Sequence, residues 1–191
     1  MSHSSRPGNE RPAGEIFLRA ASTGDNDFLL RVYTSTRQEE MAAWGWTPAR
    51  QSDFITMQFG VRQRGYAAAY PSAETCVISF GEAQAGSIIT SRARNEIRLV
   101  DIALLPEFRG CGVGGEVIRG LVSEAGESGS VLRLSVLRGN RAEHLYERLG
   151  FIATGGDAVY CEMELTPRQA QERADAANTS RENVSNAGKA E

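Results

Sequence analysis

The chain has 191 residues, of which 41% are hydrophobic and 24% charged, a composition that suits one globular domain with a sizeable core. Its formal net charge of −3 argues against a nucleic-acid-binding surface, which is normally strongly basic. The N-terminus lacks the apolar core of a secretion signal, and no apolar stretch reaches the roughly 18 residues that span a membrane. We therefore expect a cytoplasmic protein without nucleic-acid or membrane partners.

Polar segments border a single folded unit in the sequence. Residues 1–13 are rich in Ser, Pro and Gly and predict a flexible tail. Residues 167–191 form a polar C-terminal tail whose one β-branched aliphatic residue is Val184, although residues 168–177 could form a short surface helix. We expect one folded domain at residues 14–166.

The N-terminal part of this domain predicts a strand followed by two helices. EIFLRAA, residues 15–21, has the composition of a short strand. Apolar residues at helical spacing predict one helix within residues 24–44, with Asp25 placed to cap it. Thr47-Pro48 begins a second helix, because Pro is favoured at the first helical position.

The rest of the domain predicts a mixed sheet. Three apolar segments separated by the turn-like sequences GEAQ and RN predict an antiparallel meander at residues 75–81, 85–93 and 96–105. A glycine-rich loop and a helix with a clean apolar stripe follow. The closing elements are a strand at 131–138, a helix at 140–150 that Asn140 can cap, and one or two strands within 151–165. Because strand, helix and strand in succession favour parallel neighbours, we expect an α/β (α+β) fold.

The loop PEFRGCGVGG contains two overlapping phosphate-binding patterns. Gly110, Gly112 and Gly115 fit a dinucleotide fingerprint, whereas Arg109, Gly112 and Gly114 fit Arg-x-x-Gly-x-Gly. The fingerprint needs its first glycine directly after the strand and an acidic residue about 20 positions further on, and this chain has neither. No Lys-Ser/Thr follows the glycines either. The context therefore argues against both a nicotinamide-nucleotide site and a Walker-type loop.

The few potential metal ligands are scattered. Cys76, Cys111 and Cys161 lack metal-binding or disulfide-framework spacing, and the histidines are His3 and His144. We expect no metal site, and we expect the thiol of Cys111 to play no part as a nucleophile.

Two segments together resemble the GCN5-related N-acetyltransferase (GNAT) superfamily. LVDIALLPEFRGCGVGGEVIRGLV is similar to its acetyl-CoA-binding segment, and NRAEHLYERLGF is similar to the second conserved segment. Their order, their separation by one strand and the element order over residues 15–165 all agree with the family. The resemblance implies a GNAT-like mixed, mostly antiparallel central sheet of about six to seven strands flanked by about four helices.

The resemblance also implies a co-substrate, acetyl-CoA. Its pyrophosphate would lie at the glycine-rich helix N-terminus, where backbone N–H groups and the helix dipole favour an anion, and Arg109 would add a charge-assisted contact. Asn140 would cap its helix, contact the pantetheine arm, or do both. The implied cofactor-binding residues are Ile102, Ala103, Leu104, Arg109, Gly110, Cys111, Gly112, Val113, Gly114, Gly115 and Asn140.

The implied chemistry is direct attack of an amine on the thioester, within a gap between two splayed strands. A backbone N–H near Leu104 would polarise the thioester carbonyl. Tyr146 corresponds to the family tyrosine that protonates the departing thiolate; alternatively, its ring only packs in the core.

The sequence does not identify the general base. Glu96 and Asp101 are the candidates in the strand before the glycine loop, and ordered water is a third possibility. Burial in an apolar strand would raise the pKa of Asp101, although the same carboxylate could be purely structural. Ser135 stands where some relatives carry an acid.

The resemblance implies that the acceptor is a primary amine of a small molecule or a protein. Glu39 and Glu40 beside Trp44 and Trp46 could hold a cationic amine, but a solvated acidic face with tryptophans packing the helix junction is the simpler interpretation. Tyr66 and Tyr70 could line the acceptor groove.

We thus expect an acetyl-CoA-dependent N-acetyltransferase. The alternative is a non-catalytic acyl-CoA-binding sensor or scaffold. A homodimer is compatible with the pairing of edge strands in similar proteins.

Overall fold

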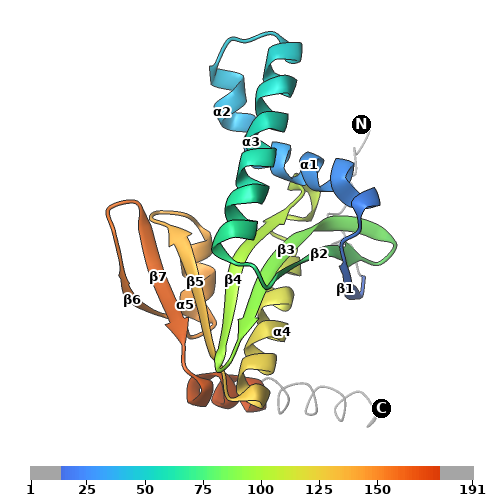
Figure 1. Ribbon diagram of the computed structural model, residues 1–191. Helices are drawn as coiled ribbons and strands as arrows, with labels where there is room; N and C mark the ends of the chain where they lie inside the picture. The colour runs from blue at the N-terminus through green and yellow to red at the C-terminus, as the bar shows by residue number, and fades with distance from the viewer. Residues whose placement is uncertain (1–13, 177–191) are drawn as a thin grey trace, which may run out of the picture.

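The computed structural model describes residues 14–176, which contain one seven-stranded sheet with helices on both faces (Figure 1). Of the tails expected at residues 1–13 and 167–191, residues 1–13 and 177–191 lie outside the described range. The strands are β1 Ile16–Ala20, β2 Ala73–Phe80, β3 Ala83–Ala93, β4 Glu96–Leu104, β5 Val131–Leu137, β6 Ile152–Gly156 and β7 Tyr160–Leu165. The helices are α1 Asn26–Ser35, α2 Gln38–Ala43, α3 Pro48–Ala69, α4 Val113–Ser128, α5 Ala142–Arg148, the 3-10 turns η1 Thr23–Asp25 and η2 Pro106–Phe108, and a C-terminal helix at 167–176.

The sheet has the order β1-β2-β3-β4-β5-β7-β6. Every neighbouring pair is antiparallel except β4 and β5, which are parallel. The predicted meander and the predicted parallel strand pair around α4 are both confirmed, as is the mixed, mostly antiparallel fold class.

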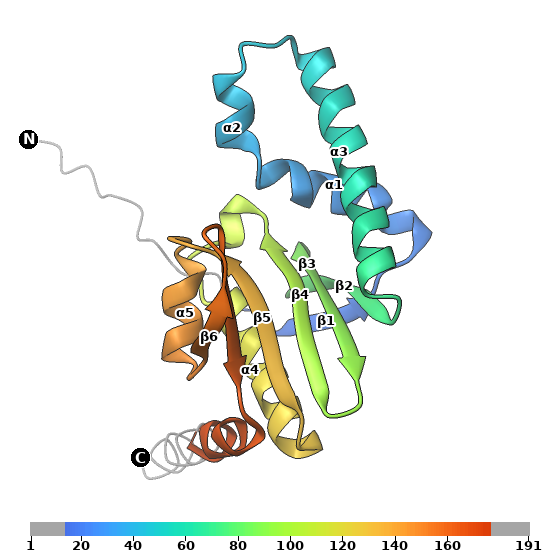
Figure 2. The same ribbon diagram turned by 60° about the vertical axis from the view of Figure 1, so that its left-hand side comes forward.

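Two apolar cores lie on opposite faces of the sheet. The strand alternation at β2 shows this directly, because Val77 and Ile78 are both fully buried but belong to different cores. Val77 packs with α1, whereas Ile78 packs with the apolar stripe of α4. In Figure 2, α1 and α3 lie on one side of the sheet and α4 on the other.

The single helix expected within residues 24–44 is divided, so that part of the prediction is wrong. The hydroxyls of Thr34, Ser35 and Thr36 each donate to a backbone carbonyl three or four residues earlier, at 2.7–2.8 Å. Such bonds compete with the helix ladder, and the chain breaks before α2. Asp25 does not cap α1 through its side chain; its carboxylate instead accepts from the Ser22 N–H and pairs with Arg19.

Helices α2 and the first half of α3 extend away from the sheet (Figures 1 and 2). Their junction is held by an aromatic cluster in which the ring centroids of Trp44, Trp46 and Phe54 lie 4.9–5.3 Å apart. Thr47 caps α3 by accepting from the Arg50 N–H, with Pro48 at the first helical position as predicted.

The C-terminal helix packs against α4. Ala170 is completely buried in the core on the α4 side. A Cβ atom added at Gly126 of α4 would lie 3.0 Å from the backbone nitrogen of Gln171. No helix formed by residues 14–176 is long and apolar enough to cross a membrane.

Gly86 on β3 lies too close to β4 to accept a side chain. A Cβ atom there would lie 2.2 Å from the carbonyl oxygen of Ala103. We predict that Gly86→Ala lowers the free energy of unfolding by about 2 kcal/mol or more, because the two strands must separate. In contrast, Gly120→Ala, in the open middle of α4, should raise it by up to about 1 kcal/mol. Urea unfolding of the two variants measures both, and equal stabilities would contradict the close approach.

Candidate active site

The site begins where β4 and β5 separate. The two strands pair only from Glu96 to Leu99 on β4 and from Val131 to Leu134 on β5. Beyond Leu99 they diverge (Figure 1), while β5 stays paired with β7 up to its end. The edge of β4 that follows Leu99 therefore has backbone groups that β5 does not satisfy, as the expected splayed strands require.

Two grooves meet in this gap. The first, which we call the loop groove, is lined by the loop glycines and by Arg109, Arg119, Arg141 and Arg148. The second, which we call the tyrosine groove, is lined by Tyr33, Tyr66, Tyr70 and Tyr160 and has a volume of about 680 Å³, enough for a small ligand. Both grooves share the residues Ile102, Asn140, Ala142 and Tyr146.

The glycine loop has a backbone that side chains would disturb. Gly110 and Gly112 have φ values of +74° and +89°, in the left-handed region that favours glycine. Gly112 precedes α4, whose first N–H groups have no carbonyl partner within the helix. The loop can therefore present backbone donors to an anion.

Of the other predicted loop residues, some line the loop groove and others have side chains that point away from it. Gly114 and Gly115 line the loop groove together with the two glycines before them. In contrast, Val113 is 1% exposed in the core, and the half-buried thiol of Cys111 lies near the carbonyl oxygen of Glu107. Cys111 and Val113 can thus contribute only through their backbone.

Arg109 ties three elements together. Its Nε donates to the carbonyl oxygen of Leu104 at 2.8 Å, and its Nη2 donates to the carbonyl and hydroxyl oxygens of Ser35 at 3.2 and 3.0 Å. The side chain lines the loop groove but is already engaged by the ends of β4 and α1. Its first role is to position the loop.

Sequence reasoning missed three other arginines of the loop groove. Arg119 pairs with Glu116 at 2.6 Å, whereas Arg141 and Arg148 form no ion pair with any residue in the range 14–176. Arg141 and Arg148 lie within the second conserved segment, so their positive charge in that motif was the available signal.

The strand residues of β4 face both sides of the sheet. Ile102 and Leu104 line the loop groove. Ala103 is 9% exposed and packs in the core beside α1, so its side chain points away from that groove. Only the backbone of Ala103 can take part in binding there.

The position of Tyr146 is compatible both with packing in the core and with contact to a ligand in the grooves. Its ring is 5% exposed and packs 5.6 Å from the ring of Phe151, yet the residue lines both grooves. Burial, with a smaller contribution from the negative charge of Asp101, raises the pKa of Tyr146 to about 12. Within the described part of the chain its hydroxyl forms no hydrogen bond. It is a neutral donor available to a ligand.

Asn140 lies one residue before the N-cap position of α5, which Arg141 occupies, and its side chain contacts the first residue of the helix. Its Oδ1 accepts from the Ala142 N–H at 2.9 Å, and the residue lines both grooves. This bond uses the side-chain oxygen, and the side-chain amide nitrogen forms no hydrogen bond with any residue in the range 14–176.

Asp101 lies in the wall of the tyrosine groove and forms an ion pair with Arg62 of α3. Burial raises the pKa of Asp101, and the nearby guanidinium limits this rise. A carboxylate in this environment can accept a proton more readily than an exposed one.

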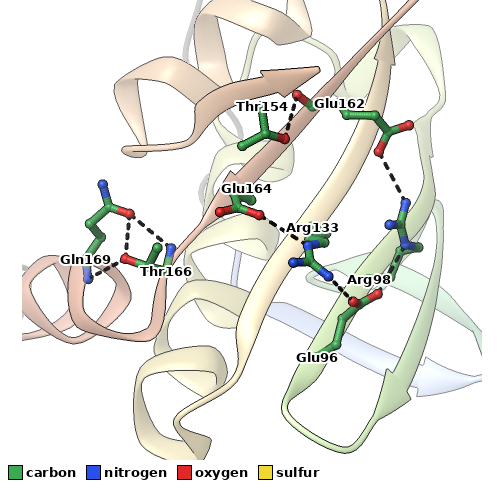
Figure 3. Close-up of polar contacts among 8 residues, drawn as sticks. All are labelled: Glu96, Arg98, Arg133, Thr154, Glu162, Glu164, Thr166 and Gln169. Atoms are coloured by element: carbon green, nitrogen blue, oxygen red, sulfur yellow. Dashed lines mark hydrogen bonds and ion pairs between the residues drawn. The ribbon is translucent and has the colours of Figure 1, made fainter. Parts of the chain in front are cut away.

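The structure does not bring Glu96 to the site. Glu96 lies at the start of β4, where the strand is still paired with β5, and lines neither groove. Figure 3 shows its carboxylate between Arg98 and Arg133, which also contact Glu162 and Glu164 of β7. Glu96 is part of an ion-pair network that crosses three strands.

The candidate acceptor residues fall into two places. Tyr66 and Tyr70 line the tyrosine groove. In contrast, Glu39, Glu40, Trp44 and Trp46 lie in the α2–α3 extension and are absent from its lining. Sequence reasoning missed Arg62, Tyr33, Arg37 and Tyr160, because these residues come together only in the folded chain.

Residues 71–153 match the family model described as acetyltransferase (GNAT) domain. The matched range contains both motifs on which the predicted resemblance rests. The chain is 37% identical over 67 residues to [ribosomal protein bS18]-alanine N-acetyltransferase of Haemophilus influenzae, a match that covers 35% of this chain and 46% of that protein. It is 43% identical over 77 residues to thialysine N-epsilon-acetyltransferase of Bos taurus, covering 39% and 44%. The matches thus span less than half of either relative.

Solved structures show the same fold over more of the chain. PaiA N-acetyltransferase of Thermoplasma acidophilum in complex with coenzyme A superposes with a TM-score of 0.58 at 18% identity, covering 80% of this chain and 99% of that one. The ribosomal-protein-S18-alanine N-acetyltransferase of Escherichia coli gives 0.55 at 20% identity, covering 80% and 94%.

The buried phenol gives a prediction for titration. At a pH of about 10, where an ordinary tyrosine is half ionised, Tyr146 should remain neutral because burial raises its pKa. Asp101→Asn should lower that pKa, since it removes a nearby negative charge. Nuclear magnetic resonance of ring-labelled tyrosine, with Tyr146→Phe to assign the signal, measures both effects. Ionisation together with the exposed tyrosines would contradict the burial of the hydroxyl.

Proposed function

We propose that the protein is an acetyl-CoA-dependent N-acetyltransferase that transfers an acetyl group to a primary amine by direct attack. The observation that carries the proposal is the meeting of two grooves at Tyr146, within the gap between β4 and β5. One groove offers backbone donors and cationic side chains, and the other offers aromatic walls. This arrangement suits a reaction in which an anionic donor and an amine approach from opposite sides.

The loop groove is the proposed site of acetyl-CoA. Its pyrophosphate would bind the N–H groups between Gly110 and Gly115, where the dipole of α4 favours negative charge. Arg119, Arg141 and Arg148 would supply charge-assisted contacts to phosphates. The pantetheine arm would follow Ile102, Ala103 and Leu104 along the free edge of β4 and pass Asn140, while Arg109, Cys111 and Val113 shape the loop.

Bound acetyl-CoA supplies an activated acyl thioester. A backbone N–H of β4 near Leu104 polarises the carbonyl oxygen. The amine nitrogen forms a bond to the acyl carbon, the carbon–sulfur bond breaks, and Tyr146 donates its proton to the sulfur. An ordinary phenol and an ordinary thiol have similar pKa values, about 10 and 8.5, so that a phenol can protonate a departing thiolate. The raised pKa of Tyr146 keeps its hydroxyl protonated until that step.

Asp101 is the proposed acceptor of the proton that the attacking amine loses. It lines the tyrosine groove, and burial raises its pKa, so that it is a better base than an exposed aspartate. Glu96 is not proposed for this role because it lies in the paired part of the sheet. Ordered water is the competing base.

The acceptor class follows from the relatives only in outline. Their names specify an alanine of a ribosomal protein and thialysine, so the amine belongs to a protein or to a small molecule. We place the reaction in the cytoplasm, without nucleic-acid or membrane partners and without a metal. The edge strands β1 and β6 offer backbone positions at which a second copy would pair in a homodimer.

Tyr146→Phe tests the catalytic role. Because phenylalanine keeps the packing against Phe151 but cannot donate a proton, kcat should fall by about a hundredfold or more. Thiol release from acetyl-CoA across a panel of amines measures this rate. Thermal shift with acetyl-CoA should show equal stabilisation of both proteins, and NAD should stabilise neither.

Two outcomes separate the alternatives. Stabilisation by acetyl-CoA without thiol release from any amine would favour the sensor or scaffold. Stabilisation by NAD alone would contradict the assignment of the loop groove.

Asp101→Asn tests the base. In the wild type, kcat/KM should rise with pH as Asp101 loses its proton, with a midpoint above the ordinary aspartate pKa of about 3.9. In the variant, kcat/KM should be about a hundredfold lower, and its rise with pH should disappear. If kcat/KM of Asp101→Asn still rises with pH in the same way, ordered water and not Asp101 is the base.

A further inference from the structure

The lining of the tyrosine groove contains more cationic than anionic side chains. The charged side chains in it are Arg37, Arg62 and Asp101, two arginines against one aspartate. Arg62 pairs with Asp101 inside the lining, whereas Arg37 pairs with Glu40, which lies outside it. The lining thus presents two guanidinium groups to an acceptor and offers a cationic acceptor only the carboxylate of Asp101, which is already paired.

Arg62 has one donor group that no described residue uses. Its Nη2 contacts Asp101, and its Nε donates to the hydroxyl oxygen of Tyr66 at 3.2 Å. Its Nη1 forms no hydrogen bond within residues 14–176, although the side chain is only 25% exposed. A largely buried guanidinium N–H that faces a cavity is satisfied by water or by a ligand oxygen.

Two of the tyrosine rings that line the groove already face a guanidinium group. The guanidinium carbon of Arg62 lies 5.0 Å from the ring centroids of both Tyr33 and Tyr66, and that of Arg37 lies 5.7 Å from the ring of Tyr33. These are the ring faces that would otherwise attract a cationic ligand. The rings instead hold the two guanidinium groups in place.

Arg37 lies at the rim of the groove. Its Nη1 contacts both carboxylate oxygens of Glu40, at 3.0 and 2.9 Å, and its side chain is 40% exposed. Glu40 therefore occupies only Nη1 of the guanidinium group, so that Arg37 keeps further N–H donors for an anion that enters the groove.

We infer that the acceptor amine carries a carboxylate on the same molecule, and that Arg62, assisted by Arg37, binds this carboxylate in the tyrosine groove. The inference rests on the proposed function and specifies its acceptor as an amino acid. A guanidinium matches a carboxylate in shape and charge. The amino group would then point toward the gap beside Tyr146, where both grooves meet. Arg62 and Arg37 act as specificity residues and take no part in bond formation.

The test compares pairs of amines that differ in one charge. Glycine, β-alanine and γ-aminobutyrate are each assayed beside their carboxamides, and spermidine serves as the cationic comparison. For the chain length that fits, the wild type should prefer the acid over its amide by about tenfold to a hundredfold in kcat/KM, as expected for charge-assisted hydrogen bonds. Thiol release from acetyl-CoA measures each rate.

Substitutions assign the preference to residues. Arg62→Gln should remove most of the preference for the acid by raising its KM, while the amide changes little in KM. Arg37→Gln should reduce the preference by a smaller factor, and it avoids any loss of folding that an unpaired Asp101 causes in the first variant. Arg64→Gln, an exposed arginine on the same helix that lines neither groove, is the matched control and should behave as the wild type.

The outcomes separate this inference from the proposed function. Equal or faster acetylation of the amides or of spermidine would overturn the carboxylate site and leave the transferase intact. If no amine is acetylated, the same acid and amide pairs are titrated calorimetrically into the protein with coenzyme A present. Tighter binding of the acid that Arg37→Gln weakens would then support the carboxylate site, and equal binding would overturn it.

Discussion

One inserted residue in β4 sets the geometry of the site. Thr90 of β3 is opposite Leu99 and Ile89 is opposite Asp101, so that Val100 is a bulge without a partner in β3. A bulge bends its strand and increases the local twist, and β4 parts from β5 at this same point. It also shifts the alternation of side chains between the two faces.

The shift in alternation distributes the functional side chains. Before the bulge, Leu99 faces the core beside α4, and a regular strand would place Asp101 on that same face. After the bulge, Ile102 packs toward α4, whereas Asp101 turns to the side of α3 and meets Arg62. Both the gap for the thioester and the charged wall of the tyrosine groove therefore depend on Val100.

Features with local causes could be predicted from the sequence, and features with tertiary causes could not. Glycines in the left-handed conformation at Gly110 and Gly112 follow from local backbone sterics, so the loop was recognisable. Glu96 and Asp101 were equivalent candidates on one strand, because the end of the β4–β5 pairing and the bulge are invisible in the sequence. The contact of Arg62 with Asp101 joins α3 to β4 and had no local signal. The three consecutive hydroxyl residues that end α1 did offer a local signal.

The proposed base and the proposed carboxylate site depend on each other through Arg62. When Asp101 takes a proton it becomes neutral, and Arg62 loses the charge that compensates it; an uncompensated charge of low exposure is costly. A carboxylate already bound to Arg62 would keep that guanidinium paired throughout the proton transfer. An acceptor of this kind would thus make it easier for Asp101 to accept a proton at the moment of attack. On this argument the groove selects an anionic amine for the same electrostatic reason that it can use a buried aspartate as its base.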